Sequence, residues 1–209
     1  VFGRPLSSAE VESIYRRGSM GKSPENPANG GSGVVIDHGD GNTIGGPATS
    51  LRNLISGNAQ YGVLIVGNSA TPVPPDYDGP PIFTDNPADL GGRGNIVVGN
   101  YIGLGADGDV ELGNRWSGVF VRDSANNQIG QGYPLAGNVI SANRNTGVFL
   151  SGEASFGNRL QGNYIGTDAL GESARGNREI GVQTNYGARY NLLGVDGNGS
   201  GDELEGNVI

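Results

Sequence analysis

A four-residue phrase that recurs along the chain constrains the fold more than any other feature of the sequence. Each copy begins with glycine and valine, and the copies start at Gly33, Gly62, Gly118, Gly147 and Gly181. They lie 29, 56, 29 and 34 residues apart (62 − 33, 118 − 62, 147 − 118 and 181 − 147). The interval of 56 becomes 34 when a Pro-rich insert at 71–92, which is 22 residues long, is left out. A period of this length with β-branched runs and Gly/Asn turns indicates a solenoid.

Asparagines keep the same register as the Gly-Val phrase. One in each unit stands two residues before an apolar residue: Asn42, Asn95, Asn127, Asn158 and Asn191. Two further phrases, Asn-Leu/Val-Ile-Ser and Gly-Asn-Tyr-Ile-Gly, begin at Asn53, Asn138, Gly99 and Gly162. We therefore predict an all-β fold, a right-handed parallel β-helix of about five rungs over residues 33–209, on the order of 24 Å long. The aligned asparagines are expected to stack as side-chain amide ladders at the turns.

Alternation along the Gly-Val strands assigns side chains to the inside or the outside of the rod. The residues expected to point inward are Val34, Ile36, Val63, Ile65, Val119, Val121, Val148, Leu150, Val182 and Thr184. The residues expected to point outward are Val35, Leu64, Phe120, Phe149 and Gln183. Because Val35, Leu64, Phe120 and Phe149 are apolar, this outer strip is predicted to be an interface rather than a catalytic face.

Composition excludes several classes of function. The net charge of −8 disfavours nucleic acid and anionic membrane surfaces as partners. No apolar run of about 18 residues exists, so we expect no membrane insertion. The chain contains no cysteine, which rules out thiol chemistry and cysteine-bound zinc.

Residues 1–32 stand apart from the repeat. Ser7 and Glu10 form a capping box that opens a predicted short helix ending near Gly18. Residues 1–22, which include the phrase from Phe2 to Val11, resemble the closing strand and helix at the C-terminal end of a laminin-G/concanavalin-like domain. The alternative is a helix that caps the first rung, and under both interpretations residues 23–32 form a connector.

The repeat itself supports a second resemblance, which covers residues 33–209. The phrases beginning at Asn126, Asn138 and Gly162 look like right-handed parallel β-helix repeats of bacterial secreted and surface proteins. This resemblance implies an extracellular or cell-surface location and an elongated scaffold, but no single activity. Some members of this group are polysaccharide lyases, epimerases or hydrolases.

One compact polar constellation, Asp37, His38 and Asp40, surrounds the only histidine. Paired carboxylates about 5 to 9.5 Å apart would suit glycoside hydrolysis. The other interpretation is a turn with solvated charge, because no Asp-Asp pair recurs beside it in the neighbouring units. The Asp-Pro-His phrase of alginate epimerase-like proteins and the Asn-Thr-Asp and Arg-Ile-Lys phrases of polygalacturonase-like ones are absent.

Two acidic loops are candidates for calcium, which prefers oxygen ligands. The first contains Asp107, Asp109 and Glu111 on a Gly-rich loop. The second contains Asp196, Asp202, Glu203 and Glu205. Solvated acidic turns are the alternative for both.

The sequence therefore predicts a non-catalytic structural or adhesive module of an extracellular bacterial protein. Its expected partners are other copies of itself or neighbouring domains of a longer chain. A further Gly-Val phrase would be due at position 210, so end-to-end association into a fibre is one expectation and a longer natural chain is another. The alternative function is a polysaccharide-binding or polysaccharide-degrading domain that lines Asp37, His38 and Asp40 along a groove with Arg52 or Arg122.

Overall fold

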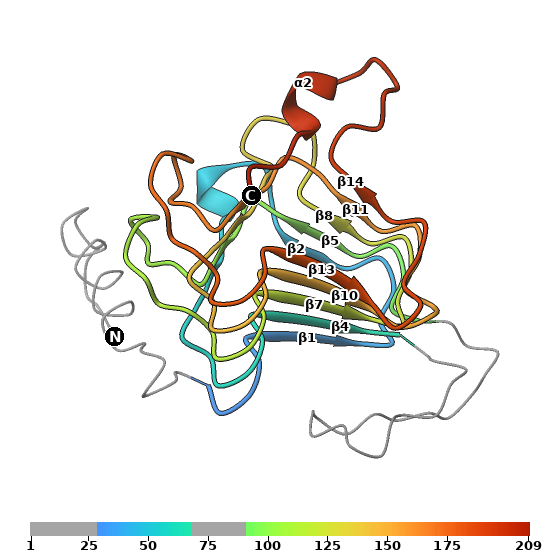
Figure 1. Ribbon diagram of the computed structural model, residues 1–209, viewed down its shortest axis with the longest axis horizontal. Coiled ribbons are helices and arrows are strands. Elements are labelled where there is room, and N and C mark those ends of the chain that lie inside the picture. The colour runs from blue at the N-terminus through green and yellow to red at the C-terminus, as the bar shows by residue number, and fades with distance from the viewer. Residues whose placement is uncertain (1–28, 68–90) are drawn as a thin grey trace, which may run out of the picture.

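A computed structural model describes residues 29–67 and 91–209, and this part of the chain winds repeatedly through three parallel sheets (Figure 1). Sheet A contains β1 (Val34–Asp37), β4 (Val63–Val66), β7 (Val119–Arg122), β10 (Val148–Ser151) and β13 (Val182–Asn185). Sheet B contains β2 (Thr43–Gly45), β5 (Ile96–Val98), β8 (Gln128–Ile129), β11 (Arg159–Leu160) and β14 (Leu192–Leu193). Sheet C contains β3 (Leu54–Ile55), β6 (Tyr101–Ile102), β9 (Val139–Ile140) and β12 (Tyr164–Ile165). One pass through sheets A, B and C is called a coil below.

Helical structure is scarce in the described residues. It consists of one 3-10 turn, η1 (Thr49–Leu51), and one short α-helix, α2 (Asp202–Glu205). The described part is therefore an all-β, solenoid-like fold of parallel sheets, as the repeat predicts. The expected N-terminal helix and nearly all of the Pro-rich insert lie outside the described residues. No described helix has the length and apolar character needed to cross a membrane.

The strand register follows the Gly-Val phrases. In sheet A, Val63 pairs with Val34 and Val119, and Val148 pairs with Val119 and Val182. The interval of 56 residues between β4 and β7 therefore spans a single step of the stack, as the shorter intervals do.

The core is a continuous column of inward side chains from all three sheets. Its members in sheet A are Ile36, Val63, Ile65, Val119, Val121, Val148 and Leu150, and Val34 and Val182 pack against it. Sheets B and C add Ile44, Val97, Ile129, Leu160, Ile55, Ile102, Ile140 and Ile165. Among the residues expected to point inward, only Thr184 is exposed, because no described strand covers β13. Burial of this column supplies about 25 cal/mol per Å² of apolar surface.

The glycine of the Gly-Val phrase is required by space rather than by backbone conformation. A Cβ on Gly118 would lie 2.5 Å from Cγ2 of Ile140, 2.7 Å from Nδ2 of Asn143 and 2.8 Å from the carbonyl oxygen of Gly147. The other turn glycines do include many with positive φ. Before β1, β4, β7 and β10, however, the glycine leaves room for an asparagine side chain of the third corner, whereas Gly181 before β13 faces Ile209.

Three asparagine ladders run along the corners of the solenoid. The first two are those predicted, Asn42-Asn95-Asn127-Asn158-Asn191 and Asn53-Asn100-Asn138-Asn163-Asn207. The third is Asn29-Asn58-Asn114-Asn143-Asn177, which the sequence reasoning missed. In every step Nδ2 donates to Oδ1 of the asparagine in the next coil, at 2.7 to 3.1 Å.

A signal for the missed ladder was present in the sequence. Each of its members stands four residues before a Gly-Val phrase, as 33 − 29, 62 − 58 and 118 − 114 show. The interior members are almost fully buried, with Asn114 and Asn143 both 0 % exposed. Buried amides are stable only when their donors and acceptors are satisfied, and the ladder satisfies them by repetition.

Candidate functional site

Candidate functional residues lie at four places in the described chain: the corner after β1, the outer side of sheet A, the acidic loops and the two end faces of the solenoid. The first three were singled out by the sequence, and their geometry decides what each can do.

The constellation at the corner after β1 is arranged as a turn. His38 adopts a left-handed φ of 57° and its Nδ1 contacts a carboxylate oxygen of Asp37. Asp40 points to a different group, since its Oδ1 accepts a hydrogen bond from the backbone N–H of Arg93 at 2.6 Å. The two carboxylates therefore have separate structural partners.

The arginines that would complete a catalytic groove lie elsewhere. Arg122 is aligned with Val66, which is aligned with Asp37, so two strand steps, on the order of 10 Å, separate it from Asp37. Its Nε lies 3.5 Å from Oδ2 of Asp123. Arg52 stacks its guanidinium 3.9 Å from the ring centroid of Tyr101 in sheet C. The structure does not bring these arginines to the Asp37–Asp40 turn.

The outer strip of sheet A forms a small lateral cluster with two aromatic residues from the turns. Leu64 and Phe120 are each 3 % exposed, and Phe149 is partly buried, whereas Val35 is 54 % exposed. The rings of Phe120 and Phe149 stack at 4.9 Å, and Tyr61 contacts both Phe120 and Trp116 at the same centroid distance. Most of the predicted interface strip is thus engaged in packing, and the exposed part is Val35.

In the first acidic loop, the carboxylates of Asp107 and Asp109 are already bonded to other groups of the protein. Asp107 Oδ1 accepts the backbone N–H groups of Asp109 and Val110, both at 3.1 Å. Asp109 is paired with Arg175, which lies two coils further along the solenoid. The backbone of Glu111 forms an antiparallel bridge with that of Leu104. The equivalent loop two coils later is closed in a similar way by Asp168, whose Oδ1 accepts backbone N–H groups of the same loop.

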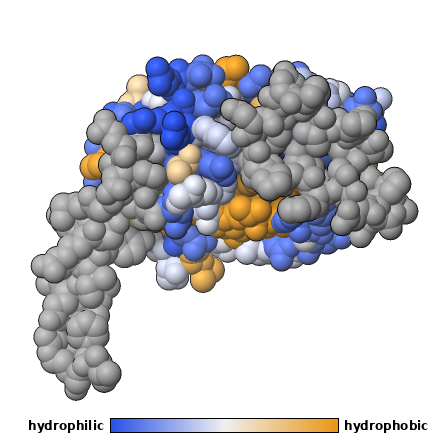
Figure 2. All heavy atoms as spheres, turned by 90° about the horizontal axis from the view of Figure 1, so that it is seen from below, coloured by the Kyte–Doolittle hydropathy of each residue, from blue (hydrophilic) through white to orange (hydrophobic). Residues whose placement is uncertain are grey.

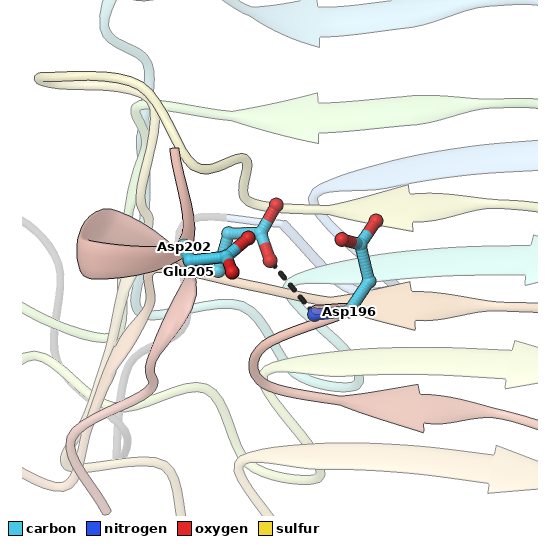
Figure 3. A group of neighbouring side chains, drawn as sticks. All are labelled: Asp196, Asp202 and Glu205. Atoms are coloured by element: carbon cyan, nitrogen blue, oxygen red, sulfur yellow. Dashed lines mark hydrogen bonds between the residues drawn. The ribbon is translucent and has the colours of Figure 1, made fainter. Parts of the chain in front are cut away.

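The second acidic loop does bring carboxylates together. Asp196, Asp202 and Glu205 place oxygen atoms within 4.8 Å of one another, and this is the one such group of three among residues 29–67 and 91–209 (Figure 3). The predicted set of Asp107, Asp109 and Glu111 is not so grouped. Glu203, also predicted here, is outside the group.

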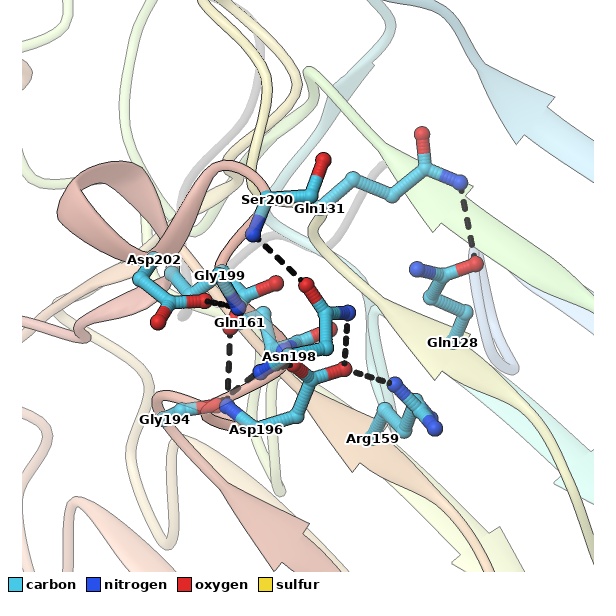
Figure 4. Close-up of polar contacts among 11 residues, drawn as sticks. Gln128, Gln131, Arg159, Gln161, Gly194, Asp196, Asn198, Gly199, Ser200 and Asp202 are labelled. Atoms are coloured by element: carbon cyan, nitrogen blue, oxygen red, sulfur yellow. Dashed lines mark hydrogen bonds and ion pairs between the residues drawn. The ribbon is translucent and has the colours of Figure 1, made fainter.

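Several contacts already satisfy the second acidic loop. Glu205 is 6 % exposed, and its Oε2 accepts the backbone N–H of Asp196 at 2.8 Å. Asp196 Oδ2 accepts hydrogen bonds from Nη1 of Arg159 at 2.7 Å and from Nδ2 of Asn198 at 3.0 Å (Figure 4). The backbone N–H of Asn198, followed by Arg159, lowers the pKa of Asp196 below its ordinary value. Three oxygen ligands suit a hard cation such as calcium, but a cation would compete with Arg159, and the carboxylates alone do not define a metal site.

Asp168 gives a prediction for the pH dependence of stability. Hydrogen bonds from the backbone, led by the N–H of Glu172, lower the pKa of this carboxyl below its ordinary value. A carboxyl whose pKa is lower in the folded state stabilises the fold above its unfolded pKa, and this contribution is lost as pH falls through the folded pKa. We expect Asp168→Asn to lower the melting temperature at pH 7, and we expect its difference from the parent chain to shrink as the pH falls below about 4, the ordinary range of an aspartate carboxyl. Glu172→Gln in the same loop is the control in thermal melts across pH, because the hydrogen bond to Asp168 comes from the backbone N–H of Glu172 and not from its side chain. A constant difference for Asp168→Asn across pH would contradict the assignment.

The two end faces were not assigned residue by residue from the sequence. One face consists of β1, β2 and β3 and has an open hollow of about 350 Å³. Its lining is partly apolar, from Val34, Ile44, Leu54 and Ile55, and otherwise made of polar residues and glycines, among them Asn29, Asn53 and Asn58. The other face consists of β13, β14 and the segment from Asn207, and Leu193 and Ile209 are exposed on it.

Comparison with known proteins adds no relative. No protein-family model matches this chain, and no curated protein or solved structure matches it significantly.

Proposed function

We propose that this chain is a non-catalytic structural or adhesive module of an extracellular bacterial protein. In this proposal it is a right-handed parallel β-helix of about five rungs, preceded by a short helical segment. The extracellular and bacterial assignment rests on the resemblance of its repeats to those of secreted and surface proteins. Neighbouring domains of a longer chain or further copies of itself are the proposed partners.

The observation that carries this proposal is how the polar residues are used. Asparagines from three corners form uninterrupted ladders, and the acids Asp107 and Asp168 close turns. Asp109 pairs with Arg175, and Asp37 contacts His38. Groups that would have to converge on a substrate are instead bonded within their own turns or to other coils, which supports a scaffold.

An activity screen tests the proposal against its polysaccharide alternative. We expect the chain to leave uronate and neutral polysaccharides uncleaved, with and without calcium, while its melting curve shows that it is folded. Release of unsaturated or reducing ends that Asp37→Asn or Asp40→Asn removes, without a change in melting temperature, would overturn the proposal. Binding of a polysaccharide without cleavage would favour the polysaccharide-binding alternative.

A further inference from the structure

The asparagine ladders give the solenoid a chemical polarity. In each ladder the side-chain Nδ2 and the backbone N–H both donate toward the asparagine of the following coil, as Asn163 does toward Asn207 at 2.9 and 3.0 Å. On the β1–β2–β3 face, the first asparagines Asn29, Asn42 and Asn53 therefore present Oδ1 acceptors to which no described residue donates.

The opposite face presents the complementary groups. Asn177, Asn191 and Asn207 accept at Oδ1 from the coil before, and each Nδ2 donates back to one carbonyl oxygen, of Ile140, Ser155 and Leu160 respectively. Their remaining amide donors face away from the preceding coil, where a following coil would supply Oδ1. One end of the solenoid is thus an acceptor face and the other is a donor face.

Both end faces also expose apolar groups that belong to the core column. Leu193 pairs in register with buried Leu160 but is 46 % exposed, and Ile209 beside Val208 is 69 % exposed. These are core positions that nothing described covers. The acceptor face offers the hollow lined by Val34, Ile44 and Ile55, and Figure 2, which views the molecule from the β1 side, shows apolar surface in the centre of that side between hydrophilic areas.

We propose, on the basis of the scaffold function, that the donor face of one copy docks on the acceptor face of a second copy, so that Asn177, Asn191 and Asn207 continue the ladders of Asn29, Asn42 and Asn53. Free edges of β13 and β14 are then paired with β1 and β2, which removes the exposed strand edges that otherwise favour non-specific pairing. Because both faces belong to the same repeat, their three corners have the same arrangement.

The polarity excludes two-fold dimers. Two acceptor faces would bring Oδ1 atoms against Oδ1 atoms, and two donor faces would bring N–H groups against N–H groups, leaving polar atoms unsatisfied. The contact is therefore heterologous, and each added copy leaves one donor face and one acceptor face free. The expected assembly is an open rod.

Two single-face variants test this proposal in the 209-residue chain. Ile209→Lys places a charge on the donor face, and Asn53→Lys replaces an acceptor with a charged donor on the acceptor face. Both positions are exposed in the monomer, so folding should persist and is checked by circular dichroism and melting. Leu170→Lys is the control, since Leu170 is 73 % exposed on a side loop.

Sedimentation velocity over a concentration series is the measurement. We expect the parent chain and Leu170→Lys to form oligomers that grow with concentration, and each face variant alone to remain monomeric. An equimolar mixture of Ile209→Lys and Asn53→Lys should form dimers and nothing larger, because each retains the face that the other lacks.

Three results would overturn the docking proposal: a parent chain that stays monomeric, a face variant that dimerises alone, or a mixture that stays monomeric. None of these results bears on catalysis. The polysaccharide screen therefore distinguishes failure of the docking from failure of the scaffold function.

Discussion

Replacing Val148 with aspartate is expected to abolish folding of this chain. Val148 is 0 % exposed and lies in register between Val119 and Val182, on a strand of sheet A that is paired on both sides. The substitution removes a packed side chain, a loss of about 1.5 to 3 kcal/mol, and places a carboxylate in the core, which costs several kcal/mol more. The sum approaches or exceeds the roughly 5 to 15 kcal/mol that stabilises a typical domain.

The matched control is Val35→Asp, the same exchange on a strand of the same sheet. Val35 points outward and is 54 % exposed, so a carboxylate there remains hydrated and the cost should be about 1 kcal/mol or less. Far-UV circular dichroism and urea unfolding of the two variants give the comparison. Equal stability of Val148→Asp and Val35→Asp would contradict the inward register on which the whole core depends.

The second large effect is expected from Asn143→Asp, which changes one amide to a carboxylate of nearly the same shape. Asn143 is 0 % exposed. Its Oδ1 accepts from the backbone and side chain of Asn114, and its Nδ2 donates to Asn177 Oδ1 at 3.0 Å. The same Nδ2 lies 3.1 and 3.2 Å from the carbonyl oxygens of Ile102 and Ser141.

Aspartate retains the acceptor but has no donor, so it would face three oxygen atoms with a buried negative charge. Each buried group left unsatisfied costs about 1 to 3 kcal/mol, and we expect a total loss on the order of 4 kcal/mol in the free energy of unfolding. Because aspartate and asparagine have nearly the same size, the substitution leaves no cavity. The loss of stability would therefore measure the effect of hydrogen-bond direction.

Asn145→Asp is the control for this prediction, since it lies two residues away in the same turn. Asn145 Oδ1 accepts from the backbone N–H and the hydroxyl of Thr146, and aspartate can accept both bonds. Its effect should be close to zero in the same urea titration. A small effect of Asn143→Asp, comparable with that of Asn145→Asp, would show that the ladders are not held by directional amide bonds.

The candidate sites were predicted less completely than the fold. The outer strip was identified as apolar, but its burial depends on Tyr61 and Trp116, which lie in the turns before β4 and β7. The first acidic loop was singled out for its carboxylates, yet Asp109 is paired with Arg175, 66 residues further along the chain. No local pattern predicts such a pairing, because it depends on how two long loops stack.

The sequence alone determined the strand register, the inward column and two of the three ladders. These follow from the period of the repeat and the alternation along each strand, which are local properties of an extended chain. Only the tertiary structure decided which polar groups meet. The grouping of Asp196, Asp202 and Glu205 requires α2 to fold back over the loop that follows β14, and the opposite polarity of the two end faces requires every ladder to donate in the same direction. Both depend on the placement of whole coils relative to one another, and that placement is set by packing across the stack.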